Sequence, residues 1–389
     1  MSPKPLSVLA SGIFGLVLTM GVARFAYTPM LAYMQPQTGM GDALAGWLAG
    51  WNYLGYLSGL LVVTRLKDLM LKDRLYRIGL LLAVLTTAMM ALGESPLLWG
   101  ASRYLAGLAT AAGLMLGSGL ILNWLIRHGH RAELGVHFSG LGLGIVLGGL
   151  LVESAAPWLD WRGQWWLLAA AGAVLAVPAW RWLPRPDQGQ PLAPHHTASV
   201  REPTRAWLWL LQAAYLCAGF GYAINATFTV LITEQQPALA GQGGLMWLLV
   251  GLAAAPAPVL WDRIARRLGY LGSLQAAFVL QILGIVLPVV SGSLLAAVAS
   301  SLLFGLTFIG IVSLVLTMVG VRYPAHPAQI MARLTLGYGV AQIIGPVVAG
   351  ELSERTGSFD GALLGVAAIM AVGLGCLIAM RGLADQRQR

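Results

Sequence analysis

An arginine lies inside the first long apolar run of the chain, in the stretch GVARFAYTPML at residues 21–31. A central arginine costs about 2.5–3.5 kcal/mol on membrane-insertion scales, so its presence needs a reason. Arg24, Tyr27 and Thr28 are spaced i, i+3 and i+4, which puts them on one face of a helix. Pro29 follows and frees a backbone carbonyl one turn earlier. The pattern predicts a cavity wall with a local bend, where the Arg24 guanidinium attracts a carboxylate or a similar anion.

Arg24 has a second interpretation, as an anchor at the membrane interface. From Lys4 to Arg24 a straight helix spans ~30 Å at ~1.5 Å per residue, which would bring Arg24 to the outer headgroups. If the helix instead runs to about Met34, Arg24 lies just outside the midpoint of the bilayer. The sequence leaves both positions open.

Other polar side chains in the apolar runs also recur at helical spacing. Arg103, Gly107 and Thr110 lie at i, i+4 and i+7 on one face. Arg103 either extends to the outer surface or faces the cavity for binding or proton traffic. Tyrosines near helix ends could also belong to interfacial belts. The predicted substrate-binding residues are Arg24, Tyr27, Asn52, Tyr56, Arg103, Tyr222, Asn225 and Gln342.

Acidic residues are absent from the predicted midplane. Those in or beside the apolar runs belong near outer helix ends, namely Asp42, Glu153, Glu234, Glu351, Glu354 and Asp360. An anionic substrate could therefore supply the countercharge that the two arginines lack. Proton coupling stays open, and the coupling candidates are Arg103, His137, Glu153 and Glu351.

The composition is that of an integral membrane protein. Of 389 residues, 58% are hydrophobic and 10% are charged, against about 25% charged in an average soluble domain. The apolar runs lack period-2 alternation, so helices are expected rather than barrel strands. With roughly 20 apolar residues needed per span, twelve spans are predicted, at 7–34, 44–64, 78–93, 97–124, 135–156, 164–182, 207–233, 243–260, 271–290, 294–321, 330–352 and 359–380.

The net charge of +9 is distributed as in a membrane protein. Basic residues cluster in the connections after even-numbered spans and at both termini, whereas the opposite side has only Arg162 and Arg355. The positive-inside rule therefore predicts that both termini are cytoplasmic. No basic domain or arm exists that would indicate a nucleic-acid partner.

The chain divides at a polar stretch. Residues 184–206 are expected to form a flexible cytoplasmic linker between six-span bundles at 1–183 and 207–389. A shift of 197 residues lays Gly140 on Gly337 and span 5 on span 11, which favours two parallel repeats with a substrate site between them. His195 and His196 in the linker lack a further ligand set, so no metal site and no cofactor is predicted.

Two further stretches complete a family resemblance. AGWLAGWNYLGYLSG (45–59) and FSGLGLGIVLGG (138–149), together with GVARFAYTPML and the basic 2–3 and 8–9 connections, resemble the YbfB/YjiJ-type branch of the major facilitator superfamily. The resemblance covers essentially the whole chain. It implies an all-α integral membrane fold of twelve helices in two six-helix pseudo-repeats, in a transporter of the bacterial inner membrane.

The resemblance also implies a cytoplasmic latch of ion pairs between the halves. Its candidates are Asp68, Asp73, Arg74, Asp262 and Arg266. Positive-inside charge alone is the other explanation for these residues. In span 5, Ile145 stands where many proton-driven exporters of the superfamily have proline, which weakens an antiporter assignment.

The functional expectation is a secondary transporter, not an enzyme. It would move a small organic solute, and Arg24 favours an organic anion. The protein is expected to be a monomer in the lipid bilayer, with protons as a candidate coupling ion. The alternatives are a broad-specificity exporter with an adaptable aromatic and methionine surface, a membrane-embedded enzyme, and a solute sensor. No P-loop motif is present for ATP-driven pumping.

Overall fold

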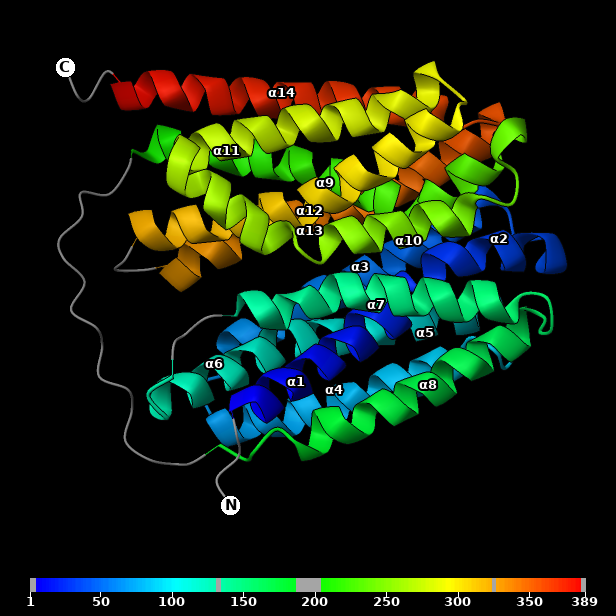
Figure 1. Ribbon diagram of the computed structural model, residues 1–389, viewed down its shortest axis with the longest axis horizontal. Coiled ribbons are helices and arrows are strands. Elements are labelled where there is room, and N and C mark those ends of the chain that lie inside the picture. The colour runs from blue at the N-terminus through cyan, green and yellow to red at the C-terminus, as the bar shows by residue number, and fades with distance from the viewer. Residues whose placement is uncertain (1–4, 131–133, 187–203, 324–326, 386–389) are drawn as a thin grey trace.

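The computed structural model describes residues 5–130, 134–186, 204–323 and 327–385, and every regular element within these ranges is helical. Figure 1 shows α9–α14 in the upper part and α1, α4, α5, α6 and α8 in the lower part, with α2, α3 and α7 along the boundary. We call α1–α8 the N-terminal group and α9–α14 the C-terminal group.

The N-terminal group begins with one continuous stretch made of three segments. Its elements are α1 (Pro5–Leu16), the π-helix η1 (Val17–Phe25), α2 (Tyr27–Thr38), α3 (Asp42–Arg65), α4 (Leu69–Met89), α5 (Pro96–Ala111), the π-helix η2 (Ala112–Gly117), α6 (Ser118–Arg127), α7 (Gly135–Ala155) and α8 (Trp161–Arg181). The elements of the C-terminal group are α9 (Arg205–Glu234), the short η3 (Pro237–Leu239), α10 (Gly243–Ala254), α11 (Ala257–Val290), α12 (Leu294–Arg322), α13 (Pro327–Thr356) and α14 (Asp360–Asp385).

Within the described residues these elements make twelve helical stretches, and nine of them are long and apolar enough to cross a membrane. Several predicted boundaries differ from the structure, and two regions show why. The third helix begins at Leu69 instead of 78, because its first turns are charged and an apolar window misses them. The eighth predicted span ended at 260, but α10 ends at Ala254. The next helix begins at Ala257 and is interrupted at Gly269, whose φ of 73° only glycine adopts readily.

Helix starts follow from short polar side chains that cap free backbone N–H groups. Asp68 accepts from the N–H of Met70 at the start of α4, and Asp160 accepts from Gly163 at the start of α8. Ser95, Thr204 and Ser293 cap α5, α9 and α12 in the same way. These caps fix where each helix begins.

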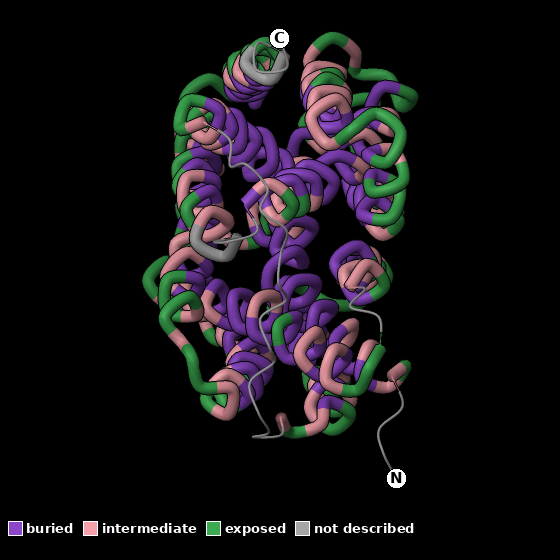
Figure 2. The backbone as a smooth tube through the Cα atoms, turned by 90° about the vertical axis from the view of Figure 1, so that its left-hand side faces the viewer, coloured by how far each residue is buried: buried purple, intermediate pink, exposed green. Residues whose placement is uncertain are grey.

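The perimeter of the molecule is apolar and the interior is packed. Figure 2 shows exposed positions around the outside and buried positions along the centre. Large apolar side chains on the perimeter are exposed, including Leu85, Val174 and Leu295. A continuous exposed apolar surface of this kind fits contact with lipid rather than water.

The two groups touch closely at the end of the bundle that contains Asp42 and Glu354, which we call the Asp42 end. There α3 packs on α13, and a Cβ atom on Gly46 would collide with the carbonyl oxygen of Pro346. The N–H of Ala43 donates to Glu354 at 2.7 Å. The hydroxyl of Ser353 donates to Asp42 at 2.7 Å. Beside this seam α7 packs along α10, so the groups are closed against each other here.

Candidate functional site

A cavity of about 340 Å³ lies between the two groups. The residues of its lining that matter most come from both groups: Arg24 and Tyr56 from the N-terminal group, and Tyr222, Phe308, Tyr338 and Gln342 from the C-terminal group. Its other walls include Phe138, Thr317 and Thr335, which lie near the ends of α7, α12 and α13 farthest from Asp42. The cavity therefore extends from Arg24 away from the Asp42 end.

Arg24 is the only charged residue among the described residues that line this cavity. Its side chain is buried, and its Nη2 donates to the hydroxyl of Tyr222 at 3.3 Å. The guanidinium carbon lies 4.6 Å from the ring centroid of Tyr53 and 5.0 Å from that of Tyr56, within cation–π range. The Nε of Arg24 has no hydrogen-bond partner among the described residues. Aromatic rings thus hold the cation, and one of its donors is unpaired within the described structure.

The backbone at Arg24 is a π-helix rather than an α-helix. In η1 the turn is wide, and the N–H of Ala26 bonds to the carbonyl of Gly21, five residues back. Such π segments often occur at functional sites. This wide turn ends at Phe25, shortly before Pro29, where the sequence predicts a bend. Thr28 uses its hydroxyl elsewhere, donating to the carbonyl of Ala226 in α9 at 2.5 Å.

Three of the predicted binding residues lie behind Arg24 and not on the cavity wall. Arg103 donates from Nη1 to the carbonyl of Ala23 at 2.8 Å and from Nη2 to the carbonyl of Arg24 at 3.3 Å. Its guanidinium lies over the ring of Tyr27, 4.4 Å from the centroid. Asn52 donates to the carbonyl of Arg103 at 2.9 Å. Arg103, Tyr27 and Asn52 therefore form a buried layer that fixes the backbone on which Arg24 is carried.

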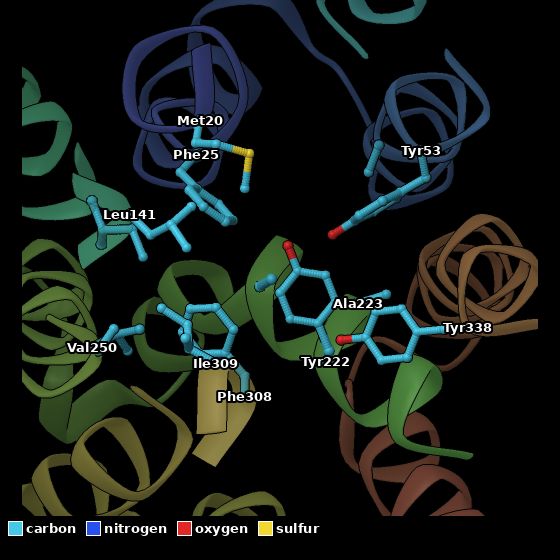
Figure 3. Close-up of a cluster of buried hydrophobic side chains, with 14 of the residues drawn as sticks. Met20, Phe25, Tyr53, Leu141, Tyr222, Ala223, Val250, Phe308, Ile309 and Tyr338 are labelled. Atoms are coloured by element: carbon cyan, nitrogen blue, oxygen red, sulfur yellow. The ribbon is translucent and has the colours of Figure 1, made fainter. Parts of the chain in front are cut away.

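Aromatic rings of the C-terminal group form the opposite wall. Tyr222 stacks on Phe308 and on Tyr338, with centroid separations of 5.4 and 6.0 Å. Figure 3 shows Tyr222 and Phe308 facing Met20, Phe25 and Tyr53 of the N-terminal group, with the ring of Tyr338 pointing toward Tyr222. Gln342 lies one turn from Tyr338 and is 3% exposed, and its Oε1 has no hydrogen-bond partner among the residues that the structure describes. Asn225 donates to the carbonyl of Gly221 at 3.0 Å and does not line the cavity.

The coupling candidates lie apart from one another. His137 is buried in α7 and shares a 2.9 Å hydrogen bond with Ser118, which is one of the residues that line the cavity. Glu153 accepts from the hydroxyl of Tyr33 at 3.0 Å, and Glu351 accepts from the indole of Trp47 at 3.2 Å. Among the described residues, His137 and Arg103 each hydrogen-bond a residue that lines the cavity, Ser118 and Arg24 respectively.

The latch candidates pair within their own groups in this conformation. Asp73 is fully buried and bonds Arg77 at 3.0 Å, with Arg185 at 3.6 Å. Asp262 pairs with Arg266 on the same helix. Asp68 caps α4 and Arg74 is exposed. In the described part of the chain, these residues form no ion pair from one group to the other.

No cluster of three or more His, Cys, Asp or Glu that could hold a metal ion occurs among the described residues. His195, His196 and most of the linker lie outside them. Sequence reasoning missed Tyr53, Phe308 and the hydrogen bonds of Asp42 and Glu354 at the Asp42 end. Tyr53 shares an i, i+3 face with Tyr56 and could have been found, whereas the partners of Asp42 and Glu354 lie 311 residues away and leave no local signal.

The arrangement of one buried cation between two groups of membrane-length helices invites comparison with known transporters. Residues 16–380 match the profile of the family described as "Uncharacterised MFS-type transporter YbfB". The chain belongs to this family. A search of curated protein sequences gives no match. This MFS-type chain is therefore a multi-pass membrane transporter, not an enzyme.

Solved structures share the fold of this MFS-type chain at low sequence identity. The nucleoside transporter NupG has a TM-score of 0.72 at 16% identity, covering 96% of this chain and 98% of that one. The human organic anion transporter MFSD10 has a TM-score of 0.66 at 17% identity, covering 97% and 100%. A bacterial homologue of the human lysosomal transporter Spinster, in an inward-facing and occupied conformation, has a TM-score of 0.70 at 13% identity, covering 98% of each chain. At these identities the likeness concerns the fold alone.

Proposed function

We propose that this transporter moves a small organic anion across the bacterial inner membrane by alternating access. Two six-helix halves, 1–183 and 207–389, rock about the cavity, and the linker 184–206 joins them on the cytoplasmic side with both termini. By the positive-inside rule the Asp42 end faces outward. The conformation described above is then inward-facing, since the groups meet at the Asp42 end and the cavity extends the other way.

The observation that carries the proposal is the unneutralised charge of Arg24. A buried charge without a partner is costly, and no acidic residue is found among the described residues that line the cavity. The surrounding tyrosine rings reduce this cost without cancelling the charge. An anionic substrate supplies the missing countercharge and binds where both groups meet, because Tyr222 of α9 contacts Arg24 of η1.

A charge-sorted panel tests this. We would measure binding to the purified protein for hexanoate, hexanamide and hexylamine, and for benzoate, benzamide and benzylamine, because each set has one size and three charges. Both carboxylates are expected to bind better than their neutral and cationic partners. Arg24→Gln should abolish that preference, and Arg24→Lys should keep only part of it, since lysine lacks the planar fork.

The matched control is Arg162→Gln. It removes one positive charge from a half-exposed side chain that pairs with Glu94, so it should leave the preference intact. Counterflow of the bound anion in vesicles would then separate a transporter from a solute sensor. An anion preference that survives in Arg24→Gln would contradict the proposal.

A broad-specificity exporter is the second candidate, because the cavity wall is mostly apolar and includes Met20, Met115 and the stacked rings. Such surfaces adapt to varied ligands. Binding of both amines and amides as strong as that of the carboxylates would favour it. Coupling to protons through His137, Glu153, Glu351 or Arg103 is part of the proposal, and His137 is favoured by its contact with Ser118.

A further inference from the structure

The rings on the C-terminal wall have nearly one orientation. Tyr215 and Tyr338 stack with centroids 4.4 Å apart and planes inclined by 22°. Tyr338 and Tyr222 are inclined by 22°, and Tyr222 and Phe308 by 27°. All four residues line the cavity. The wall therefore presents a row of roughly parallel aromatic planes rather than a random apolar surface.

One ring of this row contacts the cation. The hydroxyl of Tyr222 accepts from Arg24, so the ring in the middle of the row is also the one that contacts the guanidinium. A ligand whose carboxylate meets Arg24 thus has its body beside these rings. Because neighbouring rings of the row cover the faces of Tyr338, Tyr222 and Phe308, a flat conjugated body meets their edges. Such edge-to-face contacts give a contribution that a puckered aliphatic body of equal size does not gain.

The polar groups limit the charge and shape of the ligand further. Arg24 is the single charged residue among the described residues of the lining, which fits one carboxylate, because a second carboxylate would have no cationic partner there. Gln342, one helical turn from Tyr338, has an Oε1 without a hydrogen-bond partner in the described structure. A buried acceptor of this kind matches a donor on the ligand, such as a hydroxyl on its ring.

We infer that the preferred substrate is a planar aromatic monocarboxylate carrying a ring hydroxyl, bound with its carboxylate at Arg24, its ring on the Tyr222–Phe308–Tyr338 wall and its hydroxyl toward Gln342. This inference rests on the proposed function and narrows its substrate class. The cavity volume of about 340 Å³ is within the range of small-molecule sites.

The test compares three monoanions on the purified full-length protein by calorimetry: 4-hydroxybenzoate, benzoate and cyclohexanecarboxylate. Benzoate and cyclohexanecarboxylate share charge and size and differ in the aromatic face. Benzoate is expected to bind about fivefold more tightly than cyclohexanecarboxylate, and 4-hydroxybenzoate about fivefold more tightly than benzoate.

Two variants test which side chains cause these preferences. Phe308→Leu removes a cavity ring while it keeps an apolar side chain, so the benzoate preference should fall toward onefold with cyclohexanecarboxylate binding retained. Phe304→Leu is the matched control, because Phe304 stacks on Phe308 but does not line the cavity. It should keep the preference. Gln342→Met should remove only the advantage of 4-hydroxybenzoate over benzoate.

The outcomes separate this inference from the proposed function. If benzoate and cyclohexanecarboxylate bind equally well, and Arg24→Gln abolishes the binding of both, the aromatic preference is overturned. The proposed transport of organic anions would then still stand. Equal loss of the preference in Phe308→Leu and Phe304→Leu also overturns it, since the effect would then be structural. Binding of none of the three carboxylates, or binding that does not depend on Arg24, overturns both.

Discussion

The guanidinium of Arg103 donates to the backbone carbonyl of Arg24, at 3.3 Å, so the two buried arginines are connected through the main chain. A second donation, to the carbonyl of Ala23, fixes the adjacent peptide. Both acceptor carbonyls belong to η1, the segment with wide helical turns. Arg103 thereby acts as a positioning residue for Arg24 rather than as a ligand contact.

Arg103→Lys should therefore lower both stability and anion affinity. Lysine keeps the charge but cannot hold two carbonyls with a planar fork. The expected loss is about 1.5–3 kcal/mol for a charged hydrogen bond, seen as a lower unfolding temperature, with weaker benzoate binding in calorimetry. Arg162→Lys serves as the control. Weaker binding with an unchanged unfolding temperature would argue that Arg103 contacts the ligand itself.

The hydrogen bond from Ala43 to Glu354 should favour the conformation described here, because it joins α3 to α13 where the groups are closed. Loss of one hydrogen bond, worth about 1 kcal/mol, changes a two-state ratio about fivefold. Glu354→Ala should slow labelling of a cysteine placed at cavity residue Thr317 by an impermeant thiol reagent added from the cytoplasmic side. Cys217 and Cys376 would first be replaced. An unchanged or faster rate would contradict this role of Glu354.

Gly46→Val should prevent the close approach of α3 to α13, since a side chain there meets the carbonyl of Pro346. Hydrogen–deuterium exchange at the first turns of α3 and the last turns of α13 should then increase. Gly375→Val is the matched control, because nothing lies within 4 Å of a Cβ atom at that position. Identical exchange in the two variants would show that the seam tolerates the side chain.

His137→Gln tests proton coupling. Glutamine can still bond Ser118 but cannot carry a proton near neutral pH. Accumulation of labelled benzoate driven by a pH gradient should disappear in proteoliposomes, whereas exchange of benzoate across the membrane should continue. Glu153→Gln is the parallel variant, and it should leave accumulation intact because Glu153 bonds Tyr33 and does not line the cavity. The reverse pattern would make Glu153 the coupling residue.

Much of the fold follows from the sequence because the membrane imposes it. Long apolar runs in a membrane must be helices, because a helix satisfies its backbone hydrogen bonds within one segment. A search for apolar segments misses the charged first turns of α4, because the helical backbone begins before the hydropathy rises. It also does not reveal the interruption of α11 at Gly269.

The candidate site was predictable only in part. Helical spacing identified Arg24, Tyr56, Tyr222 and Gln342, which line the cavity. The same reasoning selected Asn52 and Asn225, whose amides bond backbone carbonyls instead. A polar face on a helix in a membrane protein can meet a cavity or another helix, and only tertiary packing distinguishes these cases. Phe308 gave no signal, because an aromatic residue in an apolar run has no distinctive neighbours.

Within the described structure no acidic residue lines the cavity beside Arg24, and this has an electrical consequence. If a monoanion neutralises Arg24, the loaded carrier crosses between its two states without net charge at this position, whereas the empty carrier moves one positive charge through part of the membrane field. A full traverse corresponds to about 2.3 kcal/mol per 100 mV. A voltage that is negative inside would then retain the empty carrier with its cavity toward the cytoplasm. The rate at which one anion is exchanged for another would then not depend on voltage. The rate of net uptake into vesicles clamped at different potentials would depend on it.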